Sequence, residues 1–504
     1  MIVRDVAAAA QGRYDLVIIG GGIQGACLLL EAARCGKRVV LLERDDFGGA
    51  TSWNSLRIIH GGLRYLQSAD LRRYRESVAD RRWFFRAFAD LVQPLPCVMP
   101  LHGHGLKRPM VLRAALLANE LLGASRGIND RNWQRGRVLN VLETLSVAPF
   151  TRLDGLQGAA MWYDGMMRSP QRVVIELIRW ACSLGATALN YVQAERLIQR
   201  DGAIRAVRAV DGTTGEVHEI ETAAVANCAG PWAGRVASAG DGDGGPLFRP
   251  SLAFNLLLDR EPLSQCGLAV SPPRAGGSDR AYFLCPFHGR ILAGTSHVPW
   301  HGDADQPRPT HQQVGQMLDD LNAAIPGFQA SHDDILRVYS GLLPTETAGS
   351  YQPAKRTLLV DHSRDGGPRG LLTIRGVKFT TARHTAQRAL RHLFPDARAR
   401  AGDTAVDRPQ WTCPVDLLDP DSPGTLEDEL VAETLERIVH EEAVVRLDDL
   451  LLRRTDWLAD PRDAQRVSDR VKSLLPELAC AAVDEPRPPH PVQQWQAAPA
   501  GGRA

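Results

Sequence analysis

The glycine pattern G-x-G-x-x-G constrains the fold of this chain more than any other feature. It consists of Gly20, Gly22 and Gly25, follows a short apolar run and opens a segment with helical spacing. Gly20 permits a tight turn, Gly22 lets the backbone approach a pyrophosphate, and Gly25 permits close packing of the helix. A second apolar run ends at Glu43, whose carboxylate suits both hydroxyls of a ribose. The order predicts a βαβ unit that holds the phosphates of a dinucleotide at the N-terminus of its helix.

An ordinary glycine turn without a ligand is the alternative, but strand, glycines, helix and acidic residue occur together here. The pattern does not separate NAD from FAD, because both carry the same ADP half. Three later segments favour FAD: residues 48–55 (GGATSWNS), 225–234 (VANCAGPWAG) and 373–383 (TIRGVKFTTAR). The last is a glycine turn before a helix, whose free N–H groups suit the electron-rich end of a reduced flavin. The candidate cofactor-binding residues are Gly20, Gly22, Ile23, Gln24, Gly25, Glu43, Arg44, Ala50, Thr51, Ser52, Ala229, Gly230, Gly376, Val377 and Thr380.

Composition excludes several other classes of protein. The net charge of +1 gives no electrostatic case for a nucleic-acid partner. The nine cysteines form no C-x-x-C pair and no metal-ligand spacing with histidine, so we expect reduced thiols, no metal site and a cytoplasmic protein. No apolar run reaches about 18 residues, so no membrane span is predicted. Peripheral contact with the inner face of the membrane through an amphipathic surface stays open.

The pattern along the 504 residues predicts an α/β fold of more than one domain. We expect a Rossmann-like FAD-binding domain of the two-dinucleotide-binding-fold type, an antiparallel β-sheet substrate domain and a C-terminal helical domain. Helices are expected at 69–92, 171–185, 425–440, 442–456 and 461–479. The predicted boundaries are 14–95, 160–235 and 335–395 for the FAD-binding domain, 96–159 and 245–334 for the substrate domain, 405–482 for the helical domain, and 1–13 and 483–504 for flexible tails.

Several motifs resemble one family. The segment HGGLRYLQ at residues 60–67, with the ATS segment before it, is similar to a loop of the flavin-dependent glycerol-3-phosphate dehydrogenases, a group of D-amino-acid-oxidase-like FAD oxidoreductases. YDGMMRSPQR, NCAGPWA, LAGTSHVPWHGD, YSGLLPT and RGVKFTTAR extend the resemblance, in order, over roughly residues 14–395. It implies oxidation of sn-glycerol 3-phosphate to dihydroxyacetone phosphate, with the hydride passing to FAD and the electrons to quinone at the membrane.

The resemblance and side-chain chemistry together give four candidate catalytic residues. By resemblance, Arg64 and Tyr65 face the substrate beside the flavin, and Lys378 matches a family lysine near both. His60 is the candidate base, because histidine titrates near neutral pH. A loop-holding role for His60 and a structural ion pair for Arg64 are the alternatives.

Three departures from the family pattern leave the substrate open. Leu343 stands where the family carries an arginine implicated in phosphate binding, SLAFNLLL at residues 251–258 replaces a polar segment, and His297 replaces an aspartate. A leucine cannot form a charge-assisted bond to phosphate. Lys355, Arg356 and Arg375 are candidate replacements.

Two further hypotheses stand beside this one, the first of them favoured by Leu343 and by the SLAFNLLL segment. One is an enzyme of the same fold acting on a non-phosphorylated hydroxy acid, amine or amino acid, with O₂ or quinone as acceptor. The other is a non-catalytic flavoprotein.

The arginines of residues 72–86 suit either contact with anionic lipid or a solvated helix face. The oligomeric state stays open.

Overall fold

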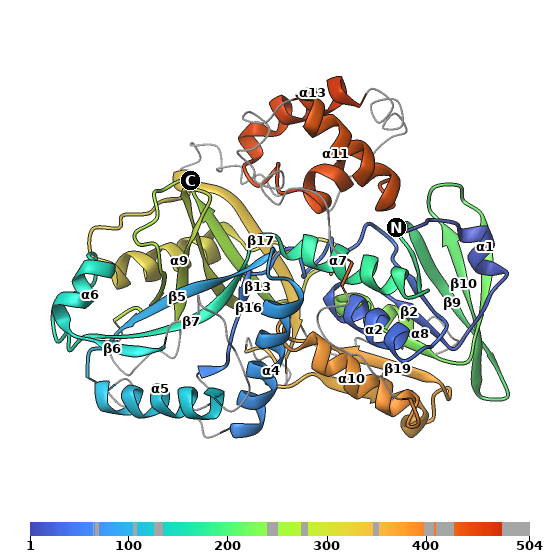
Figure 1. Cartoon of the computed structure of the whole chain (residues 1–504), viewed down its shortest axis with the longest axis horizontal. Coiled ribbons are helices and arrows are strands. Elements are labelled where there is room, and N and C mark those ends of the chain that lie inside the picture. The colour runs from blue at the N-terminus through green and yellow to red at the C-terminus, as the bar shows by residue number, and fades with distance from the viewer. Residues whose placement is uncertain are drawn as a thin grey trace, which may run out of the picture.

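The computed structural model describes residues 1–63, 65, 70–103, 108–124, 135–238, 250–273, 281–345, 352–397, 408–409 and 428–475. Arg64, residues 405–407, 410–427 and 476–482 of the predicted helical domain, and the predicted tail at 483–504 lie outside these residues. The chain forms a nucleotide-binding half, a large antiparallel sheet and a C-terminal helical unit (Figure 1). The predicted α/β class is confirmed.

The nucleotide-binding half is built on a six-stranded sheet of order β18-β19-β12-β2-β3-β8. Its strands β12, β2 and β3 are parallel, and β2 and β3 are wholly apolar, as expected of strands buried on both faces. Alternate residues of β2 point to opposite layers: Leu16 and Ile18 pack with the helices, whereas Val17 and Ile19 pack with a second sheet, of order β1-β11-β10-β9. The strands are β2 (Leu16–Ile19), β3 (Val39–Leu42), β8 (Thr187–Leu189), β12 (Val225–Asn227), β18 (Leu358–Asp361), β19 (Leu371–Arg375), and β1 (Arg13–Tyr14), β9 (Val192–Arg200), β10 (Ala203–Asp211), β11 (Val217–Thr222).

Helices cover the other face of the six-stranded sheet. They are α2 (Ile23–Arg34), α7 (Pro170–Ser183) and α10 (Ala382–Leu393). Helix α2 follows strand β2, and helix α10 follows the parallel strand β19, each after a glycine-containing turn. Helix α7 begins at a capping residue, since Ser169 Oγ accepts the N–H of Arg172. The N-termini of α2 and α10 therefore open toward the same edge of the sheet.

The second large sheet has nine strands in the order β17-β13-β16-β15-β14-β5-β7-β4, with β6 paired to β7. It is antiparallel except where β14 pairs with β5, and α9 (His311–Ala324) packs its apolar stripe against it. Strand β17 belongs to this sheet, whereas the predicted boundaries include its residues in the FAD-binding domain. The division of the chain into domains stays a prediction. The strands are β4 (Ile58–Ile59), β5 (Val92–Pro100), β6 (Arg137–Leu139), β7 (Ala159–Met167), β13 (Pro250–Leu258), β14 (Gly267–Val270), β15 (Tyr282–Phe287), β16 (Arg290–Pro299) and β17 (Ile335–Pro344).

The C-terminal unit contains α11 (Asp428–Glu441) and α13 (Ala464–Leu474), which lie above the two halves in Figure 1. The continuous helix expected over 442–456 is wrong. A short α12 (Leu447–Asp449) and a π-helical turn (Leu450–Arg454) replace it. The reason is that Asp449 caps the backbone N–H of Val445 and Arg446, so the helix starts late.

Buried ion pairs dock this unit on the nucleotide-binding half. Arg172 of α7 meets Glu442 through two contacts of 2.6 Å, and Arg454 meets Asp46 at 2.5 Å. All four side chains are at most 5% exposed. Charges that are buried in this way are stable only with their partners in place.

The predicted flexible leader at residues 1–13 is also wrong. Residues Val6–Ala10 form helix α1, and β1 pairs with β11. The Ile2 side chain is buried, and its N–H donates to the carbonyl of Glu441 at 2.7 Å. Arg4 pairs with Asp211 at 2.5 Å. The buried Ile2 side chain and the Arg4–Asp211 ion pair hold this segment in place, although its composition favours a flexible tail.

The arginine-rich segment forms α4 (Leu71–Ala87). Its interpretation as a solvated face holds for exposed Arg72, but Arg81 and Arg82 are buried. Arg81 donates to the carbonyl of Tyr163 at 2.8 Å. In the part of the chain that the structure describes, no helix is long and apolar enough to cross a membrane.

The docking of the C-terminal unit gives a stability prediction. Replacing Glu442 with alanine leaves Arg172 buried without its bidentate partner, so the free energy of unfolding should fall by about 3 kcal/mol. Urea titration followed by tryptophan fluorescence measures this change. The matched control is Glu433→Ala on the exposed face of α11, for which we expect a change below about 0.5 kcal/mol. Equal stability of the two variants would contradict the role of the buried pair.

Candidate active site

The glycine turn between β2 and α2 forms a cradle without side chains. Gly20 has a φ of +108°, and its N–H donates to the carbonyl of Leu42 at 2.8 Å. A Cβ on Gly25 would lie 1.9 Å from the Gly20 oxygen, so only glycine lets the helix pack this closely. A Cβ on Gly22 would approach only Ser52, at 3.2 Å. Ser52 Oγ accepts the N–H of Ile23 at 3.0 Å, so this hydroxyl and the glycine backbone together line the space where a phosphate can approach the helix N-terminus.

Glu43 lies at the end of β3, beside this turn. Its Oε2 accepts the N–H of Gly21 at 2.6 Å, and its Oε1 accepts the N–H of Asp45 at 3.0 Å. Burial, together with the charge of Asp45, raises the pKa of Glu43 to about 7. The two backbone N–H groups thus fix the direction of the carboxylate. Further hydrogen-bond donors, such as ribose hydroxyls, would stabilise its ionised form.

A second glycine turn, between β19 and α10, faces the first. The Gln24 amide donates to the carbonyl of Lys378 at 3.2 Å, and a Cβ on Gly376 would lie 2.5 Å from Gln24. The Oε1 of Gln24 is buried and has no hydrogen-bond partner among the described residues. A buried acceptor of this kind is stable when a ligand supplies the donor.

One cleft of about 2170 Å³ joins these features. Every predicted cofactor-binding residue lines it except Gly25, which packs behind the turn. The cleft exceeds the roughly 1,000 Å³ that encloses a drug-sized ligand. It therefore has room for a dinucleotide and a small substrate together. His60, Tyr65 and Lys378 also line it; the fourth candidate, Arg64, lies outside the described residues.

His60 pairs with an acid that the sequence analysis missed. Strand β4 pairs with β7 so that Ile59 faces Gly165, which brings His60 Nδ1 within 3.1 Å of Asp164 Oδ2. The side chain of His60 is 47% exposed, whereas that of Asp164 is 4% exposed. The available signal was one acidic residue within an otherwise apolar strand, β7.

Asp164 is held ionised by its surroundings. It accepts the N–H of Gly61 at 2.7 Å and contacts Arg81 at 3.2 Å. Burial alone would raise the pKa of Asp164, but His60, Arg81 and Gly61 outweigh it and lower the pKa to about 2. An ionised carboxylate at Nδ1 keeps a proton on that nitrogen. It leaves Nε2 of His60 as the proton acceptor.

Tyr65 lies between two cations. Its ring is 5% exposed; Lys378 Nζ lies 4.4 Å and Arg73 Cζ 4.9 Å from its centroid. Arg73 comes from α4 and was not singled out for the site. Lys355 and Arg375 line the same cleft, whereas Arg356 is exposed near Asp70. Lys378, Arg73, Lys355 and Arg375 therefore line the cleft that also holds His60.

The residues that depart from the family pattern line the cleft on the side of the nine-stranded sheet. Leu343 on β17 faces Ser251 on β13, and His297 on β16 faces Ala253. Asn255 accepts the Thr295 hydroxyl at 2.7 Å. Leu343 adds no positive charge to this side of the cleft, so an anion bound there depends on cations from other segments that line the cleft.

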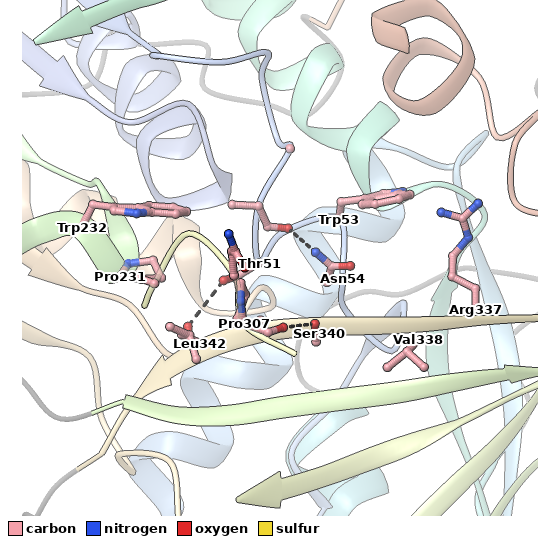
Figure 2. A pocket seen from close by; sticks show the side chains of 15 residues that line it. Thr51, Trp53, Asn54, Pro231, Trp232, Pro307, Arg337, Val338, Ser340 and Leu342 are labelled. Carbon is pink, nitrogen blue, oxygen red and sulfur yellow. Dashed lines mark hydrogen bonds between the residues drawn. The ribbon is translucent and has the colours of Figure 1, made fainter. Parts of the chain in front are cut away.

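A small pocket of about 40 Å³ adjoins the cleft behind residues 49–54 (Figure 2). Thr51 donates to the carbonyl of Leu342 at 3.4 Å and separates the two spaces. Trp53 and buried Arg337 line one end, and Trp232 the other. The pocket is too small for a cofactor. No group of three or more metal-ligating side chains occurs within the described ranges.

Comparison with known proteins identifies the family. The model of the FAD dependent oxidoreductase family (DAO) matches residues 15–387. Glycerol-3-phosphate dehydrogenase 1 of Mycobacterium bovis is 30% identical over 513 residues, covering 93% of this chain and 96% of that protein. The chain belongs to the FAD dependent oxidoreductase family.

Two solved structures share the fold. Glycerol-3-phosphate dehydrogenase from Bacillus halodurans, complexed with FAD, has a TM-score of 0.70 at 19% identity and covers 94% of this chain and 92% of that one. Glycine oxidase from Geobacillus kaustophilus has a TM-score of 0.55 at 18% identity, covering 77% and 96%. The cofactor of this enzyme is FAD, as predicted, and it acts on a small molecule with a separate electron acceptor. The glycine cradle and the orphaned Gln24 oxygen fit that cofactor.

The raised pKa of Glu43 makes FAD binding depend on pH. An ionised carboxylate is a stronger acceptor for ribose hydroxyls than a protonated one, so protonation below about pH 7 should weaken the contact expected of Glu43. We expect the Kd of the apoprotein for FAD to rise, by at most about tenfold per pH unit, as the pH falls from about 7 to about 5. Quenching of flavin fluorescence measures the Kd.

Glu43→Gln should bind FAD more weakly above about pH 7 and lose this pH dependence. The exposed Glu219→Gln should behave like the wild type. An unchanged pH profile in Glu43→Gln would exclude the assigned role.

Proposed function

We propose that this FAD enzyme oxidises the secondary alcohol of a small phosphorylated polyol, with glycerol 3-phosphate as the first candidate, and passes the electrons to quinone. The observation that carries the proposal is the single cleft shared by the glycine cradle, the His60–Asp164 pair and the cations around Tyr65. The name of the Mycobacterium bovis relative supports the same substrate.

Oxidation of an alcohol requires loss of a proton from oxygen and of a hydride from carbon. FAD supplies the hydride acceptor when it is bound. His60 takes the hydroxyl proton on Nε2, and ionised Asp164 stabilises the resulting imidazolium through Nδ1. The buried Asp164 thus orients the base and balances its charge.

The cations give the substrate its charge complement. Lys378, held over the Tyr65 ring, stabilises negative charge that develops on the substrate oxygen. Arg73, Lys355 and Arg375 line the cleft and supply the attraction for phosphate that Leu343 does not. Burial lowers the pKa of Arg375, but an arginine remains charged at neutral pH.

The alternative substrate is a non-phosphorylated hydroxy acid, amine or amino acid. Leu343 favours it, because this side chain turns an apolar surface toward the cleft. The fold is shared with glycine oxidase from Geobacillus kaustophilus. A carboxylate needs fewer cationic contacts than a phosphate. Arg73 and Arg375, which line the cleft, are able to bind a carboxylate as well.

Transfer to quinone requires contact with a membrane. Helix α5 (Pro109–Ala124) exposes 79% of Met110 and 61% of Leu117, beside exposed Arg113. Exposed apolar side chains next to a cation suit a peripheral contact with an anionic lipid surface. This helix is therefore our candidate for a membrane-facing element.

The substrate proposal is tested by anaerobic bleaching of the yellow flavin. Glycerol 3-phosphate should bleach it, and a soluble quinone should restore the colour. Glycerol, lactate and glycine should not bleach it. Bleaching by glycine or lactate, but not by the phosphate ester, would replace this proposal with the alternative.

The proposed base is tested by the rate of flavin reduction. His60→Asn should lower this rate at least about 100-fold while FAD stays bound, since proton abstraction contributes at least that factor. Asp164→Asn should also lower it, because Nδ1 loses its charged partner. The exposed His301→Asn is the control and should leave the rate unchanged. A reduction rate in His60→Asn within a few fold of the wild type would remove His60 from the chemistry.

A further inference from the structure

A loop of the nine-stranded sheet reaches across to the nucleotide-binding half. It joins β16 to α9, and its Asp305 accepts three side-chain donors there. Oδ1 accepts Arg44 Nη2 at 2.9 Å and Trp232 Nε1 at 2.6 Å, and Oδ2 accepts Arg235 Nη1 at 2.8 Å. These bonds hold the pKa of Asp305 down at about 2, although burial alone would raise it. The carboxylate stays charged at every physiological pH.

Two of these partners, Arg44 and Trp232, form a cation–π pair in the cleft. Arg44 Cζ lies 4.1 Å from the centroid of the Trp232 ring, and both residues line the cleft. Arg44 directly follows Glu43, the candidate ligand of the ribose. The pair therefore lies beside the position where the adenosine half of FAD is expected. Guanidinium and indole groups both stack on aromatic rings, so this pair suits recognition of a purine.

The loop is fixed on its other side as well. The carbonyl of Pro307 accepts the Ser340 hydroxyl of β17, and Figure 2 shows this contact beside Pro231 and Trp232. The neighbouring Asp303 pairs with Arg235 at 2.9 Å. The loop is thus a fixed bridge between β17 and the end of β3.

We infer that Asp305 is a positioning residue of the cofactor site, which holds Arg44 over the ring of Trp232 so that the pair receives the adenine of FAD. The inference rests on the binding of FAD at Glu43 and not on the identity of the substrate. It assigns Asp305, in a loop of the nine-stranded sheet, to recognition of the adenosine diphosphate group of FAD. FMN lacks that group, so Asp305 contributes to the choice of FAD over FMN.

The experiment uses the apoprotein and three probes: FAD, ADP and FMN. Asp305→Asn keeps the size of the side chain but loses the charge, so the Kd for FAD and for ADP should each rise about tenfold. The Kd for FMN should not change. Asp303→Asn is the matched control, because Asp303 bonds to neither Arg44 nor Trp232, and its Kd values should stay within about twofold of wild type.

A double variant tests whether Asp305 acts through Arg44. Arg44→Gln and the Arg44→Gln/Asp305→Asn double variant should bind ADP equally weakly, since removing the carboxylate adds nothing once the guanidinium is gone. A general structural role of Asp305 would weaken ADP and FMN alike and would add to the Arg44 effect.

Three outcomes would overturn the inference: unchanged ADP affinity in Asp305→Asn, equal losses for ADP and FMN, or the same loss in Asp303→Asn. None of these measurements involves substrate oxidation. A failure of glycerol 3-phosphate to bleach the flavin would therefore leave this result unaffected, and the reverse also holds.

Discussion

The close approach of α2 to β2 is the constraint on which the cofactor end of the molecule depends. A Cβ on Gly25 would meet the Gly20 oxygen at 1.9 Å, and a Cβ on Gly20 would meet the carbonyl of Cys228 at 2.6 Å. Strand β2, helix α2 and the end of β12 thus meet at points that have room for backbone alone. A side chain at either glycine would push the helix off the sheet and move its N-terminus away from the phosphates.

The remaining walls of the cleft come from segments that are far apart in the chain. The nine-stranded sheet supplies Leu343 and His297, and α4 supplies Arg73. The C-terminal unit is docked by Arg454 on Asp46, in the same loop that carries the predicted cofactor-binding residues Ala50, Thr51 and Ser52. Ion pairs buried this deeply gain little net energy over apolar contacts. We interpret them as fixing one docked position of the unit against the cofactor loop.

Local patterns predicted the βαβ unit well because each of its features is encoded by neighbouring residues. The apolar strands, the glycines and the helix spacing agree with one another, and the structure contains them at the expected residues. The same approach failed where a side chain finds a distant partner. The composition of residues 1–13 favours a flexible tail, but the structure pairs Arg4 with Asp211. The pattern of α4 favours a solvated Arg81, but the structure pairs it with Asp164. At residues 442–456, capping by Asp449 delays the helix that periodicity favours.

The sequence by itself determined the glycine turn of the βαβ unit, the family and a set of candidate residues that line the cleft, because these depend on short motifs. Only the tertiary structure decided which residues act together. Asp164 is 104 positions from His60, and Asp305 is 261 positions from Arg44. The first pair depends on the register that sets Ile59 against Gly165, and the second on a loop that crosses between two sheets. Strand register and loop crossing are set by the packing of the whole chain, so no local pattern of residues contains them.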